Sequence, residues 1–525
     1  MRQKIVVIGS GFAGLSAACF MAKAGWHVTV LEKHDIPGGR ARQLKAGGFT
    51  FDMGPSWYWM PEVFEHFFKS FDKKVSDYYT LQRLNPSYRV YWQQDKTDVP
   101  ADYEILKRLF ETIEPGSSKQ LDLFLKEAAY KYKIATNKLM YKTGRPIIEL
   151  LDWNLLTGLF RFDVFGSIKD HVSRHFKNPI LQQLMEFPVL FLGASPEKTP
   201  ALYSLMNYTD IKGGTWYPEG GMYSIAKAMY NLAVELGVEF CFNHNVTEII
   251  IEKKAAKKVI AQTNDQGLPI MKSFDADAVI SGADYHYIEN NLLPETYRSY
   301  SKNYWDTRVM APGCLIYYVG LNKRLKNLSH HSLFFDTSFE VHSKEIYEKK
   351  KWPSNPLFYV SATSVTDKTV APEGHENLFF LIPVASGLTN DSEELREKYF
   401  EMIVDRMEHR LKQNIRDSIV YKKTFAHSDF INEYNSFKGN AYGLANTLMQ
   451  TAFLKPSCHS KKINNLFYAG HLTVPGPGVP PCLISGEIVA KEVLKRFNSK
   501  KVKEHNNFTG NKIGVKNTYK RKDQG

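Results

Sequence analysis

The stretch that decides the fold is Lys4-Ile-Val-Val-Ile8-Gly9-Ser-Gly11-Phe-Ala-Gly14. A short apolar strand runs directly into three glycines, and residues 15–24 are typical of a helix that Gly25 ends. Residues 27–31 then predict a second strand, with Glu32 at its end. Strand, glycine turn, helix, strand and acid in this register indicate a Rossmann-like dinucleotide-binding unit rather than an ordinary glycine turn.

Each glycine of this turn has a physical role in binding a dinucleotide. Gly9 makes the tight turn, Gly11 lets the backbone approach a pyrophosphate, and Gly14 lets helix and strand pack closely. The phosphates would lie at the helix N-terminus, where free N–H groups and the helix dipole favour negative charge. Glu32 is placed to accept hydrogen bonds from an adenosine ribose, and its charge disfavours a 2′-phosphate.

The next residues favour FAD over NAD. Pro37-Gly-Gly-Arg40-Ala41 and Phe49-Thr-Phe-Asp52-Met-Gly54-Pro55 come soon after the second strand. A simple NAD domain needs no second glycine pair with a basic residue here, whereas the larger FAD must also be held at its far end. Arg40 is expected near the pyrophosphate or the flavin, with a surface ion pair as the alternative.

The far end of the chain supplies the other half of this site. Residues 465–486 predict a strand, a Gly/Pro-rich loop and a helix from about Leu483. We expect this strand to lie beside the first one, with its loop facing the flavin ring and ribityl chain. Many FAD proteins carry an acid after the glycine of this strand, but this chain has His471 after Gly470.

Four segments together resemble the bacterial-type phytoene desaturases, which are carotenoid desaturases within the flavin amine-oxidase-like superfamily. The resemblance runs from about residue 4 to residue 497. It is carried by the opening turn, by Asp52–Ser56 with Trp57-Tyr-Trp-Met-Pro61 after it, by Tyr217–Met222 and by the closing loop Gly470–Gly486. It implies a long polyene substrate and a contact between the backbone near Val246 and the adenine.

On these grounds the expected cofactor is FAD. The cofactor-binding residues expected are Gly9, Ser10, Gly11, Ala13, Gly14, Glu32, Lys33, Gly39, Arg40, Gly54, Pro55, Ser56, Val246, Gly282, Gly470, Gly478, Val479 and Pro480. No catalytic base is assigned. The aromatic residues Trp57, Tyr58 and Trp59 are expected either to line a substrate tunnel or to pack in the core.

The predicted fold class is α/β: a GR2-type, Rossmann-like FAD-binding domain, an α+β substrate domain and a helical insertion that associates with membranes. The FAD-binding domain is discontinuous and comprises residues 1–75, 211–284 and 456–497. The helical insertion spans 76–210, and the substrate domain spans 285–455. In the substrate domain, residues 314–320, 357–360 and 377–382 are expected to form strands of an antiparallel sheet, and Asp391-Ser392 is expected to cap a long helix. A basic tail, 498–525, is expected to be disordered because it has few apolar residues.

The cysteines and the lengths of the apolar runs indicate which kind of protein and compartment to expect. The five cysteines among 525 residues are scattered without a CxxC pair, so neither disulfides nor a zinc site is expected. The chain starts directly in a strand and has no run of 18 apolar residues, which predicts neither a signal peptide nor a membrane-spanning helix. We expect a cytoplasmic protein held at the cytoplasmic membrane face, with no nucleic-acid partner.

Two stretches are candidates for the membrane contact. Lys126, Lys131, Lys133, Lys138, Lys142 and Arg145 precede the Trp-, Leu- and Phe-bearing segment 147–162, and together they could lie in a membrane interface. The alternative is a core helix pair with a solvated basic face. The net charge of +13 is concentrated partly in the tail, which either attracts anionic lipid or merely solubilises the chain.

Two histidine pairs suggest no further site. His171 and His175 have a spacing that suits a metal, but no third ligand is evident, so no metal is predicted. His330 and His331 are expected at the surface.

The expected chemistry rests on one dinucleotide unit without a second GxGxxG. Nothing then delivers a nicotinamide hydride, so the flavin is expected to oxidise the substrate and pass electrons to an external acceptor, a quinone or oxygen. The resemblance implies oxidation of a CH–CH pair to C=C, which is expected to occur by hydride transfer to the flavin and loss of a proton from the neighbouring carbon. A phytoene desaturase with lycopene-type products is the first interpretation. Alternatives are another carotenoid oxidoreductase or isomerase, such as a hydroxycarotenoid desaturase, an amine oxidase, and a non-enzymatic prenyl-protein escort factor.

Overall fold

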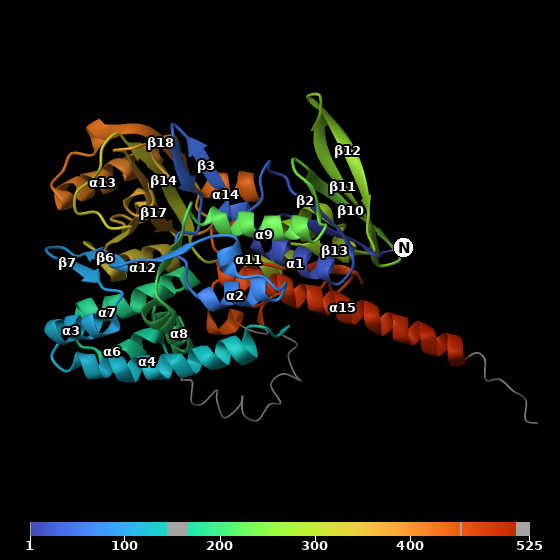
Figure 1. Cartoon of the computed structure of the whole chain (residues 1–525), viewed down its shortest axis with the longest axis horizontal. Helices are drawn as coiled ribbons and strands as arrows, with labels where there is room; N and C mark the ends of the chain where they lie inside the picture. The colour runs from blue at the N-terminus through green and yellow to red at the C-terminus, as the bar shows by residue number, and fades with distance from the viewer. Residues whose placement is uncertain (1, 144–165, 452–453, 511–525) are drawn as a thin grey trace, which may run out of the picture.

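The computed structural model describes residues 2–143, 166–451 and 454–510 (Figure 1). A five-stranded parallel sheet has the order β19-β13-β1-β2-β9. Its strands are β1 (Lys4–Ile8), β2 (His27–Leu31), β9 (Glu239–Cys241), β13 (Ala278–Ser281) and β19 (Leu466–Tyr468). The prediction that the last strand lies beside the first was wrong, because β13 lies between β19 and β1.

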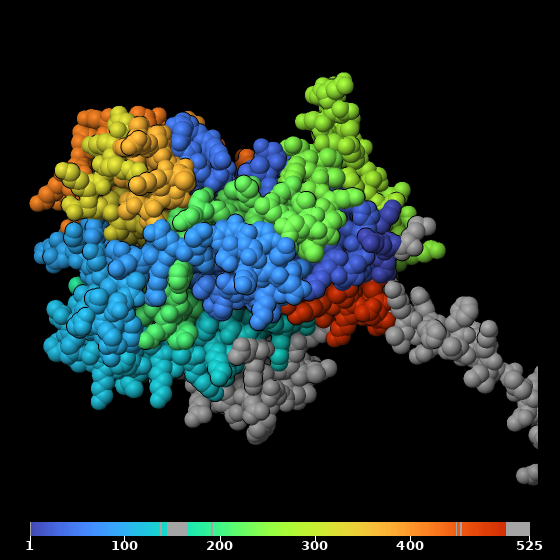
Figure 2. Space-filling model, in the orientation of Figure 1, coloured from blue at the N-terminus to red at the C-terminus, as the bar shows by residue number. Residues whose placement is uncertain are grey.

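Both faces of this sheet are covered, as expected for parallel strands. Ile5 and Val7 of β1 pack beneath α1 (Phe12–Lys23), α9 (Tyr223–Glu235) and α15 (Val479–Gly510). Val6 and Ile8 point to the opposite side, since side chains alternate along a strand, and pack with a three-stranded antiparallel sheet. That sheet comprises β10 (Asn245–Glu252), β11 (Ala255–Asp265) and β12 (Leu268–Asp275), and its far end projects from the body in Figure 2.

A second, seven-stranded sheet has the order β18-β14-β17-β16-β15-β6-β7. Its strands are β14 (Gly313–Leu321), β15 (His331–Phe334), β16 (Phe358–Ser361), β17 (Glu376–Val384), β18 (Ile419–Phe425), β6 (Tyr88–Tyr91) and β7 (Lys96–Val99). The predicted antiparallel arrangement of β14, β16 and β17 is present. Strands β6 and β7 come from the segment predicted as a mostly helical insertion and extend this sheet through a parallel pairing with β15.

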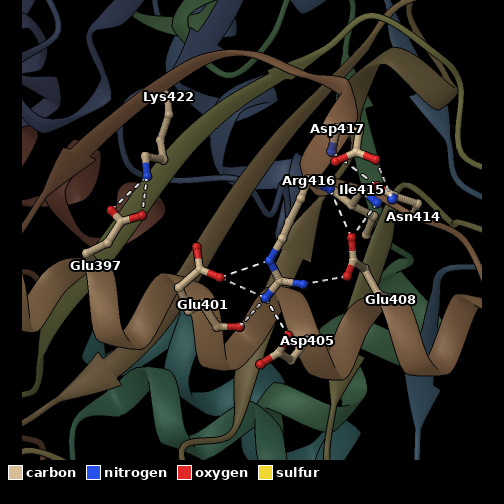
Figure 3. A network of polar contacts seen from close by, with 9 residues as sticks. All are labelled: Glu397, Glu401, Asp405, Glu408, Asn414, Ile415, Arg416, Asp417 and Lys422. Carbon is tan, nitrogen blue, oxygen red and sulfur yellow. Dashed lines mark hydrogen bonds and ion pairs between the residues drawn. The ribbon is translucent and has the colours of Figure 1, made fainter.

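The outer face of the second sheet is covered by α13 (Glu393–Leu411), which begins where predicted because Ser392 Oγ accepts a hydrogen bond from the Leu395 N–H at 3.2 Å. Figure 3 shows how charged side chains join this helix to residues 414–422, which come after it in the chain. Arg416 forms ion pairs with Glu401, Asp405 and Glu408, and Lys422 of β18 pairs with Glu397 at 2.6 Å. The helix and the edge strand are thereby fixed to each other.

The other face of the second sheet packs against a helical lobe. Its helices are α3 (Tyr103–Ile113), α4 (Ser117–Ile134), α6 (Ile168–His175), α7 (Pro179–Glu186) and α8 (Leu205–Tyr208), at the lower left of Figure 1. The other α-helices and strands of the described residues are α2 (Pro61–Lys69), α10 (Tyr285–Tyr287), α11 (Lys302–Asp306), α12 (Phe339–Tyr347), α14 (His427–Tyr434), and the pairs β3 (Gln43–Ala46) with β4 (Phe49–Asp52) and β5 (Leu81–Arg83) with β8 (Trp216–Pro218).

The basic stretches differ from their predicted structure in two places. Lys131 is buried, and its Nζ donates to Ala201 O at 3.1 Å and to Ser204 Oγ at 3.0 Å, so it does not belong to an exposed basic face. Helix α15 continues to Gly510, so residues 498–510 are helical where disorder was predicted. Arg145 and segment 147–162 lie outside the described residues, as does the end of the tail. None of the helices within the described ranges combines the length and apolar character of a membrane span.

Candidate active site

A cavity of about 390 Å³ lies at the carboxyl ends of β1, β13 and β19. This edge of an open parallel sheet is where ligands bind in such folds. All the predicted cofactor residues except Ser10 and Gly14 line this cavity, namely Gly9, Gly11, Ala13, Glu32, Lys33, Gly39, Arg40, Gly54, Pro55, Ser56, Val246, Gly282, Gly470, Gly478, Val479 and Pro480. Segments from both ends of the sequence therefore meet in one cavity.

Ser10 and Gly14 support the lining without forming it. The backbone N–H and Oγ of Ser10 donate to Glu32 Oε2 at 2.8 and 2.7 Å, and Glu32 Oε1 accepts from the His34 N–H at 3.0 Å. The buried Glu32 carboxylate is thus held in one orientation. At Gly14 an added Cβ would lie 2.0 Å from Gly9 O, so no side chain fits between helix and turn.

The glycine turn leaves room for a phosphate group. A Cβ added at Gly11 would meet nothing within 4 Å, although Gly11 is the N-cap of α1 and lines the cavity. The first turn of α1 contains no acidic residue that would compete for its free N–H groups. The cradle therefore fits an anionic group at a helix N-terminus.

Arg40 faces the cavity as a buried cation. Its Nη2 donates to Ser436 Oγ at 3.0 Å, and its Nε is buried with no hydrogen-bond partner among the described residues. Burial lowers the pKa of Arg40, and the nearby Asp284 carboxylate opposes that shift. The described residues show no ion pair of Arg40 with a carboxylate, in contrast to the surface alternative. A ligand with carbonyl or phosphate oxygens would satisfy the free Nε.

The C-terminal loop brings His471 and Cys482 to the same cavity. His471 Nε2 is buried and lies 3.9 Å from Asp284 Oδ2. Burial, followed by the charges of Arg40 and Lys455, holds the pKa of His471 well below its usual value, so the imidazole is neutral. Burial also raises the pKa of the Cys482 thiol to about 12, which keeps it protonated and a poor nucleophile for covalent attachment of a cofactor.

The other half of the cavity is apolar. Its walls come from the segment after β4, from α8, from the second sheet and from the loop after α14: Trp57, Trp59, Met60, Met206, Cys314, Ile316, Tyr359, Leu381 and Tyr442. Trp57 and Trp59 line the cavity, in agreement with the expectation of a substrate tunnel rather than of plain core packing. Tyr58 does not: it is buried, stacks on Phe64 and shares a 3.0 Å hydrogen bond with Tyr79 Oη.

His331 does not lie at the surface as predicted, and Tyr359 lines the cavity without having been among the expected site residues. His330 and His331 are both buried, not at the surface. The His331 ring stacks on Trp57 with centroids 4.2 Å apart, and its Nδ1 lies 2.6 Å from Tyr359 Oη. His331 lies on β15 of the second sheet. That position could have suggested its burial, but this strand was not predicted.

The pair His171 and His175 has a third neighbour that was not foreseen. Glu127 of α4 brings a carboxylate oxygen to 3.8 Å from His171 Nε2, and the ligand atoms of these three residues lie within 4.8 Å of one another. Arg174 Nη2 lies 3.2 Å from His171 Nδ1, so a guanidinium charge lies beside the group. This cation disfavours a bound metal ion.

Comparison with known proteins identifies the family. Residues 12–494 match the family described as flavin containing amine oxidoreductase. The chain belongs to this family. It is 40% identical over 495 residues to the carotenoid 3,4-desaturase of Haloarcula japonica, covering 94% of this chain and 98% of that one. It is 31% identical over 499 residues to the zeta-carotene-forming phytoene desaturase of Myxococcus xanthus, covering 94% of each chain.

These identities place the chain among the carotenoid desaturases of the flavin containing amine oxidoreductases. It is an FAD-dependent oxidoreductase acting on CH–CH groups. An oxidoreductase from Methanosarcina mazei shares the fold, with a TM-score of 0.60, 17% identity, and coverage of 93% of this chain and 100% of that one. Rab GDI from Plasmodium falciparum also shares it, with a TM-score of 0.53, 11% identity, and coverage of 94% and 98%. The desaturase matches favour a carotenoid desaturase over an amine oxidase or an escort factor.

Proposed function

We propose that this desaturase introduces a C=C bond into a carotenoid held along the apolar half of the cavity, beside FAD held in the glycine-lined half. The observation that carries the proposal is that one cavity joins the two halves. Its polar cradle suits a dinucleotide, and its floor of aromatic and aliphatic side chains suits a hydrocarbon.

Each part of the cradle has a proposed cofactor contact. The turn Gly9–Gly14 would hold the pyrophosphate, Glu32 the adenosine ribose, and the backbone at Val246 the adenine. Arg40 and the loop 470–480 would hold the flavin end. When bound, FAD supplies a two-electron oxidant for a CH–CH pair.

The chain's own residues position the hydrocarbon and exclude water. Trp57 and Trp59 line the cavity, and aromatic rings there would stabilise positive charge that develops along a polyene. The neutral His471 and the protonated Cys482 add no fixed charge there. A CH–CH pair loses two hydrogens overall, and we assign no side chain as the base because a delocalised carbocation releases a proton readily.

Two carotenoid reactions are candidates. The 40% identity to a carotenoid 3,4-desaturase, against 31% to a phytoene desaturase, favours desaturation near the end of an already coloured carotenoid. Phytoene desaturation with lycopene-type products is the second candidate. The test is to express the chain in two strains that accumulate either phytoene or lycopene and to record pigment spectra. A red shift only in the lycopene strain supports the first candidate, colour only in the phytoene strain supports the second, and no change in either contradicts both.

The substrate and the electrons require external partners. Each buried CH₂ is worth about 0.8 kcal/mol, so a carotenoid has almost no aqueous concentration and must enter from lipid. We therefore place the enzyme at the cytoplasmic membrane face, with a quinone or oxygen as acceptor. Sedimentation with anionic liposomes tests the membrane contact, and equal recovery in the supernatant with and without lipid would contradict it. Mixing reduced enzyme with each acceptor under anaerobic control identifies which one restores the oxidised flavin spectrum.

A further inference from the structure

Two tyrosine hydroxyls in the apolar half of the cavity bear on where the substrate's proton goes. A delocalised carbocation needs no strong base, but the proton that it releases needs an acceptor within reach. Tyr359 and Tyr442 both line this half. The Tyr442 hydroxyl lies 3.8 Å from the Cys314 thiol, whereas the Tyr359 hydroxyl lies 2.6 Å from Nδ1 of the His331 imidazole. Of the two hydroxyls, only that of Tyr359 is therefore backed by a group that can take up a proton.

Strands β15 and β16 hold Tyr359 and His331 together. In this antiparallel pairing Leu333 is opposite Tyr359. His331 is opposite Ser361. Because side chains alternate along a strand, His331 and Tyr359 project from the same face of the sheet as diagonal neighbours. The Trp57 ring covers the imidazole, with centroids 4.2 Å apart, and His331 is fully buried. The hydrogen bond between the two side chains is thus shielded from water.

Both partners are neutral before the reaction. Burial holds the pKa of His331 well below its usual value, and the neighbouring His330 lowers that pKa further. Burial raises the pKa of Tyr359, and the nearby side chains of Ser361 and Ser56 oppose that rise. The tyrosine hydroxyl therefore keeps its proton and donates it to His331 Nδ1, so Nε2 carries the imidazole proton. This Nε2 is buried without a hydrogen-bond partner among the described residues, so no acceptor there holds its proton.

Tyr359 lies between the two halves of the cavity. It lines the apolar part, and its hydroxyl is a neighbour of Ser56, one of the predicted cofactor residues. The carbon that loses the proton is next to the carbon that loses the hydride, so the acceptor has to lie near the flavin end of the substrate. His471 also lines the cavity. Burial and the charges of Arg40 and Lys455 disfavour an added proton on that ring.

A line of polar groups continues from His331 to the edge of the sheet. The His330 ring centroid lies 4.5 Å from that of His331, and His330 Nδ1 lies 2.8 Å from Oγ1 of the half-buried Thr366. Burial lowers the pKa of His330 to about 3, and the nearby Asp367 carboxylate opposes that shift. This ring is therefore also neutral, and a proton on His331 has polar groups beside it instead of an apolar wall.

We propose that Tyr359 and His331 together receive the proton that the substrate loses. After a hydride has left for the flavin, the C–H bond of the neighbouring carbon breaks and its electron pair becomes the π bond of C=C. The proton forms an O–H bond at Tyr359 Oη while the original hydroxyl proton passes to His331 Nδ1, so the tyrosine stays neutral and the imidazole becomes a cation. Tyr359 is the catalytic residue, and His331 acts through it as a positioning residue. This inference rests on the proposed function and holds for either candidate carotenoid.

The test uses the FAD-loaded, full-length enzyme and liposomes that contain phytoene or lycopene, whichever the wild type converts. Chromatography measures the desaturated product and the geometric isomers of the recovered substrate. The double bonds of a delocalised cation are weakened, so a cation that regains its hydride before it loses a proton returns as isomerised substrate. Titration with FAD measures cofactor affinity independently of turnover.

Two variants separate proton uptake from packing. Tyr359→Phe removes one oxygen, and His331→Asn keeps an acceptor for the Tyr359 hydroxyl but cannot hold an added proton. Tyr399→Phe is the matched control, because Tyr399 is buried at the outer face of the same sheet and its hydroxyl donates to Pro353 O at 2.6 Å.

We expect Tyr359→Phe and His331→Asn to lower kcat about a hundredfold, with KM and FAD affinity within about twofold of the wild type. The ratio of isomerised substrate to product should rise about tenfold or more in both, because the cation persists longer before its proton is lost. Tyr399→Phe should match the wild type in turnover and in this ratio.

A slower Tyr359→Phe with an unchanged ratio of isomer to product would mean that the hydroxyl only shapes the cavity, and it would overturn the proposal. Wild-type turnover in His331→Asn would show that the imidazole merely holds the hydroxyl, and would remove His331 from the proton transfer. Should His331→Asn fail to bind FAD, Tyr359→Phe decides alone, since it changes a single atom. A wild type that converts neither carotenoid contradicts the proposed function itself, and this inference with it.

Discussion

Gly11→Ala should separate cofactor binding from folding. A methyl group at Gly11 meets no atom within 4 Å, and its extended backbone (φ −70°, ψ 175°) accepts alanine, so the apoprotein should fold. The same methyl would project into the cavity at the N-terminus of α1, where the pyrophosphate is proposed to approach the backbone. If it keeps the phosphate from the N–H groups, the loss of a single charge-assisted hydrogen bond, about 1.5–3 kcal/mol, weakens FAD binding about tenfold to a hundredfold.

Gly14→Ala, in contrast, should destabilise the folded apoprotein. Its Cβ would lie 2.0 Å from Gly9 O, which is backbone and cannot rotate away. Overpacking of this kind costs about 1–3 kcal/mol or more, so the apoprotein itself should lose stability. Gly213→Ala is the matched control, because Gly213 also has no atom within 4 Å of an added Cβ but does not line the cavity.

The assay has two readouts. Thermal unfolding of the apoproteins measures stability, and titration with FAD, monitored by flavin fluorescence, measures affinity. We expect Gly11→Ala and Gly213→Ala to melt within a degree or two of the wild type, with only Gly11→Ala impaired in FAD binding. Wild-type FAD affinity in Gly11→Ala would refute the proposed approach of the pyrophosphate to this turn.

Three further predictions concern other parts of the molecule. Glu32→Gln keeps an acceptor for the Ser10 donors, but it removes the charge and turns an amide N–H towards the His34 N–H. FAD affinity should fall about tenfold in the same titration, and the apoprotein should lose about 1 kcal/mol of stability; unchanged FAD affinity would contradict the proposed ribose contact. Burial raises the pKa of Asp210 from 3.8 to about 7, so between these pH values the unfolded chain binds fewer protons than the folded one. The free energy of unfolding should therefore fall by up to roughly 4 kcal/mol from pH 4 to 7. Asp210→Asn should flatten this pH dependence in denaturant titrations, and an unchanged pH dependence would exclude this carboxyl as its cause. Arg416→Ala, which removes three ion pairs of a half-buried guanidinium, should cost about 1 kcal/mol in low salt and less in 1 M salt without changing flavin content. Salt-independent destabilisation would point to lost packing instead.

The elements that short stretches encode were the ones best predicted from the sequence. Strand β1, the glycine turn and α1 are contiguous, and the contact that excludes a side chain at Gly14 is made with Gly9 of the same turn, so motif and structure agree. The cap of α13 by Ser392 is equally local. The site residues could be read from these motifs because the cavity is built at the ends of the same strands.

The errors concern pairings between distant segments. Nothing in residues 465–470 indicates that β13 lies between β19 and β1, because every strand of a buried parallel sheet is similarly apolar. His331 carries a polar side chain, yet it is buried because Trp57 and Tyr359, far away in sequence, cover and hydrogen-bond its ring. Lys131 was likewise misplaced, since its partners Ala201 and Ser204 are about 70 residues away.

The order of strands in the flavin-binding sheet also bears on how the protein is made. Strand β19 and the loop that completes the cavity come from residues after 465, whereas the turn that they face is among the first fourteen. A ribosome therefore releases the opening strand and helix long before their neighbours exist, and the nascent chain cannot gain stability from its cofactor until residues 466–480 have been synthesised. Chaperones and an adequate supply of FAD at that late moment should govern the yield of active enzyme, and small deletions at the C-terminal side of Gly470 should be as damaging as deletions at the start.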